Sequence, residues 1–318
     1  MRSVLLALAL VVAAASCLAK DPITSSGTGG AANGGTTSKG GAPGTGGKVG
    51  TGGVTSNGGT TSSGGTSGPP PAIDCTDTAA SFTNLVTGQY GGGQIPVDGS
   101  SGKSYFMQAN WWGNPPTAPQ EQISGLGYTI SGSVSAGSNV IGYPSIFIGS
   151  YQGKASKGSN LPKQISALTS VPTIFSTNVD SQGVASYNAA YDVWLTANSN
   201  LVTGSGPGTD GAYLMVWLFK PSDKQPRGSI LADGRFVDGV SGAWTVWGDT
   251  TNPPCISYVS TSKISSLEFD LNLFIQDAVK MKYGNIKSSQ YLSIIFAGFE
   301  VWSGGDGLQV KKFCANVK

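Results

Sequence analysis

The sequence predicts an all-β fold, a two-sheet antiparallel sandwich of the β-jelly-roll type with one packed α-helix. Residues 72–318 alternate strand-like apolar runs with Gly, Asn, Ser and Pro turns at short, even spacing, which is typical of sandwiches. Hydrophobic residues make up 39% of the chain and charged residues only 11%, so a large core can form. One segment alone departs from the strand pattern and shows helical spacing.

The clearest predicted strands are Tyr143–Ser150, Ala189–Ala197, Tyr213–Lys220, Trp244–Trp247, Ser257–Ser260 and Ser293–Trp302. In the third, alternate residues from Leu214 to Leu218 are aliphatic, and those from Tyr213 to Trp217 are Tyr, Met and Trp. Because side chains alternate between the faces of a strand, these two sets point in opposite directions. We expect the aliphatic face to pack in the core and the other face to line a cleft.

The predicted helix covers about residues 270–283. Apolar residues recur there at helical spacing from Leu271 to Met281. Asp270 is a candidate N-cap, and Lys282 and Gly284 are typical of the C-terminal end of a helix.

The composition excludes several classes of function. The chain has no histidine, which rules out catalytic triads and metal sites that depend on imidazole. Its four cysteines form no Cys-x-x-Cys pair, so zinc ribbons and thioredoxin-type motifs are absent. The net charge is +2 without a basic run, which argues against nucleic acid as a partner. We predict no metal and no cofactor.

The N-terminus predicts export from a bacterial cell. Residues 1–16 carry Arg2 and an apolar run too short to span a bilayer, which is typical of a secretory signal. Small residues directly before Cys17 resemble a lipobox and predict lipidation there, with plain cleavage near Ala15 as the alternative. We expect a secreted or outer-surface protein that meets the membrane only through Cys17.

Residues 17–71 are predicted to be a lipid-anchor site followed by a disordered linker. Gly, Ser and Thr dominate this segment, and such a chain buries too little apolar surface to offset its conformational entropy. Its flexible reach is roughly 35–42 Å. Residues 72–318 then form one folded domain, which we expect to be a monomer. With Cys17 lipidated, three cysteines remain, and spacing does not show which two pair.

Five segments carry a resemblance to a known family. They are Asn110–Gly113, Leu161–Ser166, Ala190–Asp192, Leu214–Leu218 and Ala297–Glu300. Their residues and order resemble glycoside hydrolase family 12, and the resemblance extends from about Phe82 to the C-terminus. It implies a jelly-roll endoglucanase or xyloglucanase that degrades polysaccharide, with β-glucan or xyloglucan as partner. It also implies substrate contacts from four residues: Asn110, Trp112, Met215 and Trp217.

The resemblance further implies a retaining mechanism, in which two carboxyl groups lie about 5–5.5 Å apart. Glu300 falls on the acid/base position of the family, and Asp192 falls on the position of an Asp that neighbours the nucleophile. The nucleophile position lies two residues before Met215, and Tyr213 occupies it. Neither residue adjacent to Tyr213 is acidic, so a shift of one position restores no carboxylate.

Several interpretations follow from this departure. The protein could be a glycan-binding, lectin-like surface lipoprotein that has lost hydrolysis. Tyr213 could be the nucleophile if a base assists it. Asp192 could replace the missing base and activate water, with Glu300 as acid, which would require a carboxyl separation of roughly 6.5–9.5 Å. The fold alone would also suit a scaffold.

The chain has only three glutamates, so the other two need a place. Glu121 lies in a segment rich in Pro and Gln, and we expect it to be solvated. Glu268 precedes the predicted helix, and we expect it at the surface.

Overall fold

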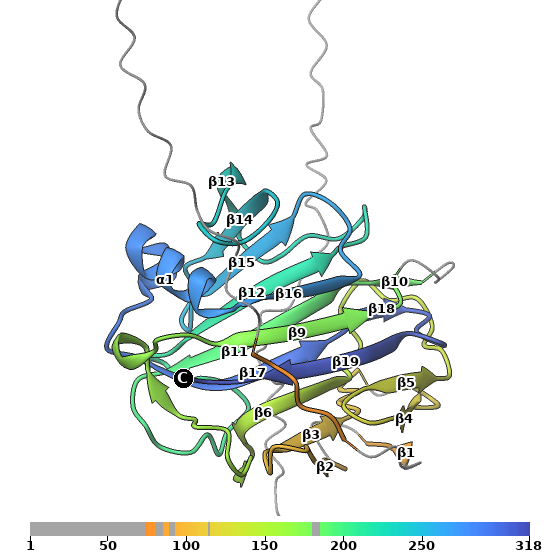
Figure 1. The fold of residues 1–318 in the computed structure, drawn as a ribbon. Coiled ribbons are helices and arrows are strands. Elements are labelled where there is room, and N and C mark those ends of the chain that lie inside the picture. The colour runs from red at the N-terminus through yellow and green to blue at the C-terminus, as the bar shows by residue number, and fades with distance from the viewer. Residues whose placement is uncertain (1–73, 80–84, 89–92, 114, 180–184) are drawn as a thin grey trace, which may run out of the picture. The chain divides into compact units, whose positions relative to one another are not determined.

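The computed structural model describes residues 74–79, 85–88, 93–113, 115–179 and 185–318. Strands dominate this part of the chain and form two large sheets with one α-helix beside them (Figure 1). The predicted all-β sandwich with a single helix is confirmed. Within the described residues, no helix is long and apolar enough to cross a membrane.

The smaller of the two large sheets has six strands. Their order is β1 (Leu85–Val86), β4 (Gln120–Ile123), β5 (Tyr128–Ser131), β19 (Gln309–Ala315), β9 (Pro172–Thr177) and β16 (Ser266–Asp270). Every pairing in this sheet is antiparallel.

The larger sheet has eleven strands and carries the site. Its main path is β13 (Ser229–Arg235), β14 (Trp244–Asp249), β15 (Cys255–Ser260), β12 (Ala212–Phe219), β11 (Ala189–Thr196), β17 (Tyr291–Gly298), β6 (Ser145–Tyr151), β3 (Ser104–Gln108) and β2 (Ile95–Asp98). The short strands β7 (Lys154–Ala155) and β8 (Lys163–Gln164) pair with β6 and β17. Only β12 and β15 pair in parallel.

All six predicted strands are present, but the last is interrupted. β17 ends at Gly298, and β18 (Val301–Ser303) begins a separate two-stranded ladder with β10 (Ser186–Tyr187). Glu300 therefore lies in the break between two strands, whereas the sequence pattern predicts one continuous strand through it. This break matters because it lets the chain around Glu300 pair with the segment that precedes β11.

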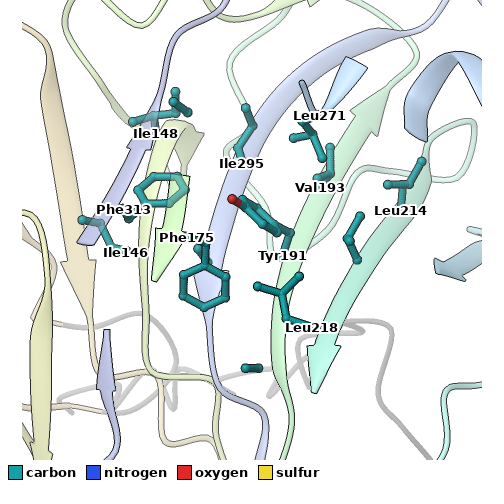
Figure 2. Close-up of a cluster of buried hydrophobic side chains, with 14 of the residues drawn as sticks. Ile146, Ile148, Phe175, Tyr191, Val193, Leu214, Leu218, Leu271, Ile295 and Phe313 are labelled. Carbon is teal, nitrogen blue, oxygen red and sulfur yellow. The ribbon is translucent and has the colours of Figure 1, made fainter. Parts of the chain in front are cut away.

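The core lies between the two large sheets because each turns an aliphatic or aromatic side inward. Figure 2 shows Val193, Leu214 and Ile295 of the larger sheet in one cluster with Phe175 and Phe313 of the smaller sheet. All five side chains are fully buried, and each contributes roughly 1.5–3 kcal/mol relative to an exposed side chain. The aliphatic side of β12 faces this core as predicted.

The helix α1 spans Asn272–Met281, within the predicted range. Phe274, Ile275 and Ala278 are buried against the sandwich, but Met281 at the end of the predicted apolar stripe is 40% exposed. Met281 is exposed because the helix ends there, where Lys282 adopts a left-handed conformation with φ of 56°.

The ends of the helix differ in detail from the sequence expectation. Leu271 rather than Asp270 occupies the N-cap position. The Asp270 carboxylate still accepts the backbone N–H of Asn272 at 2.9 Å, and it also accepts that of Val171 at 2.6 Å. Gly284 does not end the helix but belongs to the following 3₁₀ turn, Tyr283–Asn285. A second 3₁₀ turn spans Ile165–Ala167.

A disulfide between Cys75 and Cys314 joins the start of the described domain to its last strand. The bridge spans 239 residues of sequence, which is why spacing alone could not select it. Beside it, the buried Asp77 accepts hydrogen bonds from Ser101 and Tyr105. The first described residues are thus fixed to a strand of each large sheet, β19 and β3.

Glu121 is not solvated, contrary to the sequence expectation. It lies in β4 between Val86 of β1 and Ile130 of β5, and its side chain is fully buried. Burial raises the pKa of this carboxyl well above its usual range. Glu268 is exposed as predicted, in β16.

Candidate active site

The face of the larger sheet that points away from the core carries a second buried cluster, here called the aromatic face. Its large side chains are Phe106, Tyr143, Phe147, Tyr151, Trp194, Tyr213, Met215, Trp217, Phe296 and Trp302. Many of these rings meet edge to face or tilted, with centroids 4.9 Å apart for Phe147 and Phe296 and 5.4 Å apart for Tyr151 and Trp194. Such contacts hold each ring in one orientation.

Asp192 lies at the centre of the aromatic face. It is the middle of β11, where its direct partners are Met215 on β12 and Phe296 on β17. One alternation along β11, Trp194 pairs with Tyr213. The register therefore places Asp192, Met215 and Tyr213 on one surface. Met215 and Tyr213 lie on the same face of β12, as the alternation of the sequence predicts.

The Asp192 carboxyl is able to exchange a proton near neutral pH. The side chain is 2% exposed, and burial raises its pKa to about 7 although a hydrogen bond from Trp194 acts in the opposite direction. Trp194 Nε1 donates to Asp192 Oδ2 at 3.0 Å. The other oxygen, Oδ1, has no hydrogen-bond partner among the described residues. A carboxyl with such a pKa and one available oxygen has the properties of a general base.

Glu300 is held by Asn188, which directly precedes β11. The Asn188 Nδ2 group donates to Glu300 Oε2, and the Glu300 backbone N–H donates to Asn188 Oδ1 at 2.9 Å. The backbone N–H of Asn188 also donates to the Glu300 carbonyl at 3.0 Å. Both residues are buried, so these bonds fix the carboxyl of Glu300 in place.

Tyr213 is buried, and its ring stands edge-on to Trp194 with a centroid distance of 5.7 Å. Its hydroxyl faces Gly206, where a Cβ atom would lie only 2.7 Å away. Burial and the nearby Asp192 raise the pKa of Tyr213 well above its usual range, while Arg227 acts in the opposite direction. The hydroxyl has no hydrogen-bond partner among the described residues. A nucleophile must lose its proton, and no base among the described residues is bonded to this phenol to take it.

Three predicted site residues meet around one small hollow. Asn110, Trp112 and Asp192 line it together with Gln108, Tyr143, Tyr151, Trp194 and Phe296. Trp112 Nε1 donates to the Val140 carbonyl at 3.0 Å, which orients its ring. Met215 and Trp217 belong to the aromatic face but do not line the hollow. Trp217 Nε1 donates to Met215 Sδ at 3.4 Å.

Sequence reasoning missed Asn188 and did not assign Trp302. Asn188 lies two positions before Ala190 and four before Asp192. Alternation along the strand therefore places it on the same side as Asp192, and the sequence could have shown this. Trp302 is buried on the aromatic face, whereas Trp244 packs in the core against Phe274. Among the residues that the structure describes, no three Cys, Asp or Glu side chains gather as metal ligands would.

The chain is similar in sequence to known proteins. The model of glycosyl hydrolase family 12 matches residues 103–318, which is more than half of the chain. The chain belongs to glycosyl hydrolase family 12. The protein named Probable cellulase Cel12b, from Mycobacterium tuberculosis, is 32% identical over 161 residues, 50% of this chain and 99% of that protein. The Probable xyloglucan-specific endo-beta-1,4-glucanase A of Aspergillus terreus is 27% identical, over 64% of this chain and 78% of that protein.

Solved structures of family 12 share the fold. Endoglucanase cel12A from Rhodothermus marinus superposes with a TM-score of 0.60 and 33% identity, covering 67% of this chain and 92% of that one. A metagenome-derived family 12 endoglucanase gives a TM-score of 0.64 and 28% identity, covering 75% and 99%. The chain thus has the jelly roll of this family of glycoside hydrolases.

The raised pKa of Asp192 predicts how stability depends on pH. The folded state keeps this carboxyl neutral up to about pH 7, whereas the unfolded chain ionises it near pH 3.9. The contribution of Asp192 to the free energy of unfolding is therefore fully present below about pH 4. It is lost as the pH rises to about 7, by at most about 4 kcal/mol. Urea unfolding between pH 4 and 8 measures it.

The Asp192→Asn variant has no carboxyl at this position and does not lose stability in this way. Its free energy of unfolding should therefore rise steadily relative to that of the native protein from pH 4 to 7. The exposed Asp210 provides the matched control, because Asp210→Asn removes a carboxyl without changing a buried one. A constant difference between Asp192→Asn and the native protein across this range would contradict the assignment.

Proposed function

We propose that this protein acts on β-1,4-linked glucans of the cellulose or xyloglucan type. Its relatives in family 12 carry the names cellulase, endoglucanase and xyloglucan-specific endoglucanase. The observation that carries the proposal is the set of buried polar atoms left without partners on the aromatic face, next to a fixed carboxyl group.

Four such atoms support a polyhydroxylated ligand. Asn110 Oδ1, Asp192 Oδ1, the Tyr213 hydroxyl and Trp302 Nε1 are buried and have no hydrogen-bond partner among the described residues. An unpaired buried polar atom costs free energy, so several on one face call for a common partner. A sugar supplies hydroxyl groups that both donate and accept, together with apolar ring faces that stack on aromatic side chains.

The ordinary mechanism of retaining glycosidases does not suit this site. It needs a carboxylate that forms a covalent bond to the sugar, and the resemblance places Tyr213 at that position. Because burial and Asp192 both keep the phenol of Tyr213 protonated, it is a poor substitute. A tyrosine nucleophile would need a base bonded to its hydroxyl, and the described residues provide none.

Hydrolysis by direct attack of water fits the remaining groups. Glu300 gives its proton to the glycosidic oxygen as the bond to the anomeric carbon breaks. Water attacks that carbon, and Asp192, with a pKa of about 7, takes the proton that water loses. A single displacement inverts the anomeric configuration, so a β-linkage yields an α-product.

A second candidate is glycan binding without turnover, and Tyr213 favours it. An aromatic ring in place of a reactive carboxylate gives a sugar a surface to stack on and removes the group that would attack it. For either function, we propose that the signal at residues 1–16, the lipid at Cys17 and the linker place the domain at the outer cell surface, where such polysaccharides are met.

Hydrolysis is tested with xyloglucan, barley β-glucan and carboxymethylcellulose by reducing-sugar release, and proton NMR of fresh products reports the anomer. We expect release of α-product, with losses of 100-fold or more in Glu300→Gln and Asp192→Asn. Calorimetric titration with cello- and xyloglucan oligosaccharides runs in parallel. Binding without release would establish the second candidate, and neither binding nor release would refute both.

Replacing Tyr213 tests the missing nucleophile directly. Tyr213→Glu places a carboxyl on the strand face that already holds Met215 and Trp217, so the surrounding residues are in place. We expect glucanase activity to rise and the product to become β, because a covalent step restores retention.

Adding Glu300→Gln to Tyr213→Glu should abolish the gain. Tyr213→Phe should weaken binding, because it removes one hydroxyl offered to the sugar, but it should leave the anomer of the product unchanged. Abolition of a robust native activity by Tyr213→Phe would instead mean that the phenol itself takes part in the chemistry.

A further inference from the structure

We infer that Asn188 is a positioning residue for Glu300, holding the carboxyl in the orientation from which it gives its proton to the glycosidic oxygen. The inference rests on the proposed role of Glu300 as acid and extends it to a residue that makes no contact with the reacting atoms.

The two residues face each other where two ladders meet. Tyr187 pairs with Val301 in the β10–β18 ladder, and Ala190 pairs with Gly298 in the β11–β17 ladder. Asn188 and Glu300 occupy the position between these pairs, where the backbone N–H of Asn188 donates to the Glu300 carbonyl at 3.0 Å. The break in the strand thus sets Glu300 directly opposite Asn188.

The orientation of the Asn188 amide follows from its own contacts. Its Oδ1 accepts the backbone N–H of Glu300 at 2.9 Å, and a backbone N–H can only donate. The other end of the amide must then be the NH₂ group, and it donates to Glu300 Oε2. Both contacts involve one residue, so the side chain cannot turn without breaking both. A donor held in this way fixes one carboxyl oxygen of Glu300, and the orientation of the other oxygen is then fixed as well.

The amide also affects the charge of Glu300. A hydrogen bond donated to a carboxylate favours the charged form, so removing it raises the pKa of the carboxyl. Three other titratable groups also influence the charges on this face: Asp192 on β11, Tyr143 before β6, and Lys224. Burial, Asp192 and Glu300 all raise the pKa of Tyr143. Lys224 Nζ lies 5.9 Å from the centre of the Trp302 ring. Because these groups are present in both the native protein and the Asn188 variant, the difference in the pKa of Glu300 between them reports the effect of the amide alone.

The structure contains a matched control on the smaller sheet. Asn178 Nδ2 donates to the Gly307 carbonyl at 2.7 Å, and Asn178 Oδ1 accepts the backbone N–H of Gln309 at 2.8 Å. This asparagine bridges two segments by the same kind of paired contact, and both of these partners are backbone groups. Asn178→Ala therefore removes an equivalent clasp without touching Glu300.

The test is a carbon NMR titration of protein labelled at the glutamate carboxyl carbons. The chain has three glutamates, so three signals appear, and Glu300→Gln identifies the one that matters. We expect Asn188→Ala to raise the midpoint of Glu300 by about one to two pH units, as loss of a bond to a charged group implies. Asn178→Ala should leave that midpoint unchanged.

An unmoved Glu300 midpoint in a folded Asn188→Ala protein would overturn the inference. If Asn188→Ala does not fold, Asn188→Asp replaces it. This variant keeps the shape, loses the NH₂ donor and adds a like charge, so it should raise the midpoint at least as far. A midpoint unchanged in Asn188→Asp counts equally against the inference.

The titration needs no turnover, so it separates this inference from the proposed function. If the native protein hydrolyses glucan, Asn188→Ala should lower kcat 10- to 100-fold with little change in KM and move the basic limb of the pH profile upward. A shifted midpoint without any native hydrolysis would keep the Asn188–Glu300 coupling and reject the enzyme. A lower kcat with an unshifted midpoint and pH profile would reject the coupling.

Discussion

The pairing of β11 with β12 on one side and β17 on the other is the constraint on which the site depends. It sets Asp192 between Met215 and Phe296, and its continuation past the break in the strand sets Asn188 against Glu300. A shift of one residue in either register would turn these side chains into the aliphatic core. The core beneath, where Val193 packs with the smaller sheet, therefore fixes the chemistry above it (Figure 2).

On the assignment proposed above, the chain keeps the acid of a family 12 site and replaces its nucleophile. Glu300, the proposed acid, is bonded to Asn188, and the aromatic face surrounds Asp192. At the nucleophile position predicted from the resemblance, Tyr213 places a neutral ring against Trp194. Asp192 is then a carboxyl with an available oxygen and a pKa of about 7. Loss of the covalent step with retention of the acid explains why inversion and simple binding are the two outcomes we consider.

Alternation in the sequence was enough to predict the two faces of β12, because period two follows directly from strand geometry. It could not show that Glu121 is buried, since that depends on strands β1 and β5 beside it. The Cys75–Cys314 bridge and the Asn188–Glu300 contact join residues more than a hundred positions apart, which local patterns do not reveal. The helix begins one residue later than the sequence predicts, with Leu271 and not Asp270 at the N-cap. Helix ends commonly differ by one or two residues between methods of assignment.

The proposed function requires that the aromatic face bind a β-glucan with Glu300 at the bond between two sugars. A crystal structure of Glu300→Gln with a cello-oligosaccharide tests it most directly. We expect a chain of sugars on the aromatic face, with sugar hydroxyls bonded to Asn110 Oδ1 and Trp302 Nε1. A glycosidic oxygen should lie within hydrogen-bond distance of residue 300. An oligosaccharide bound elsewhere on the domain, with this face empty, would contradict the account.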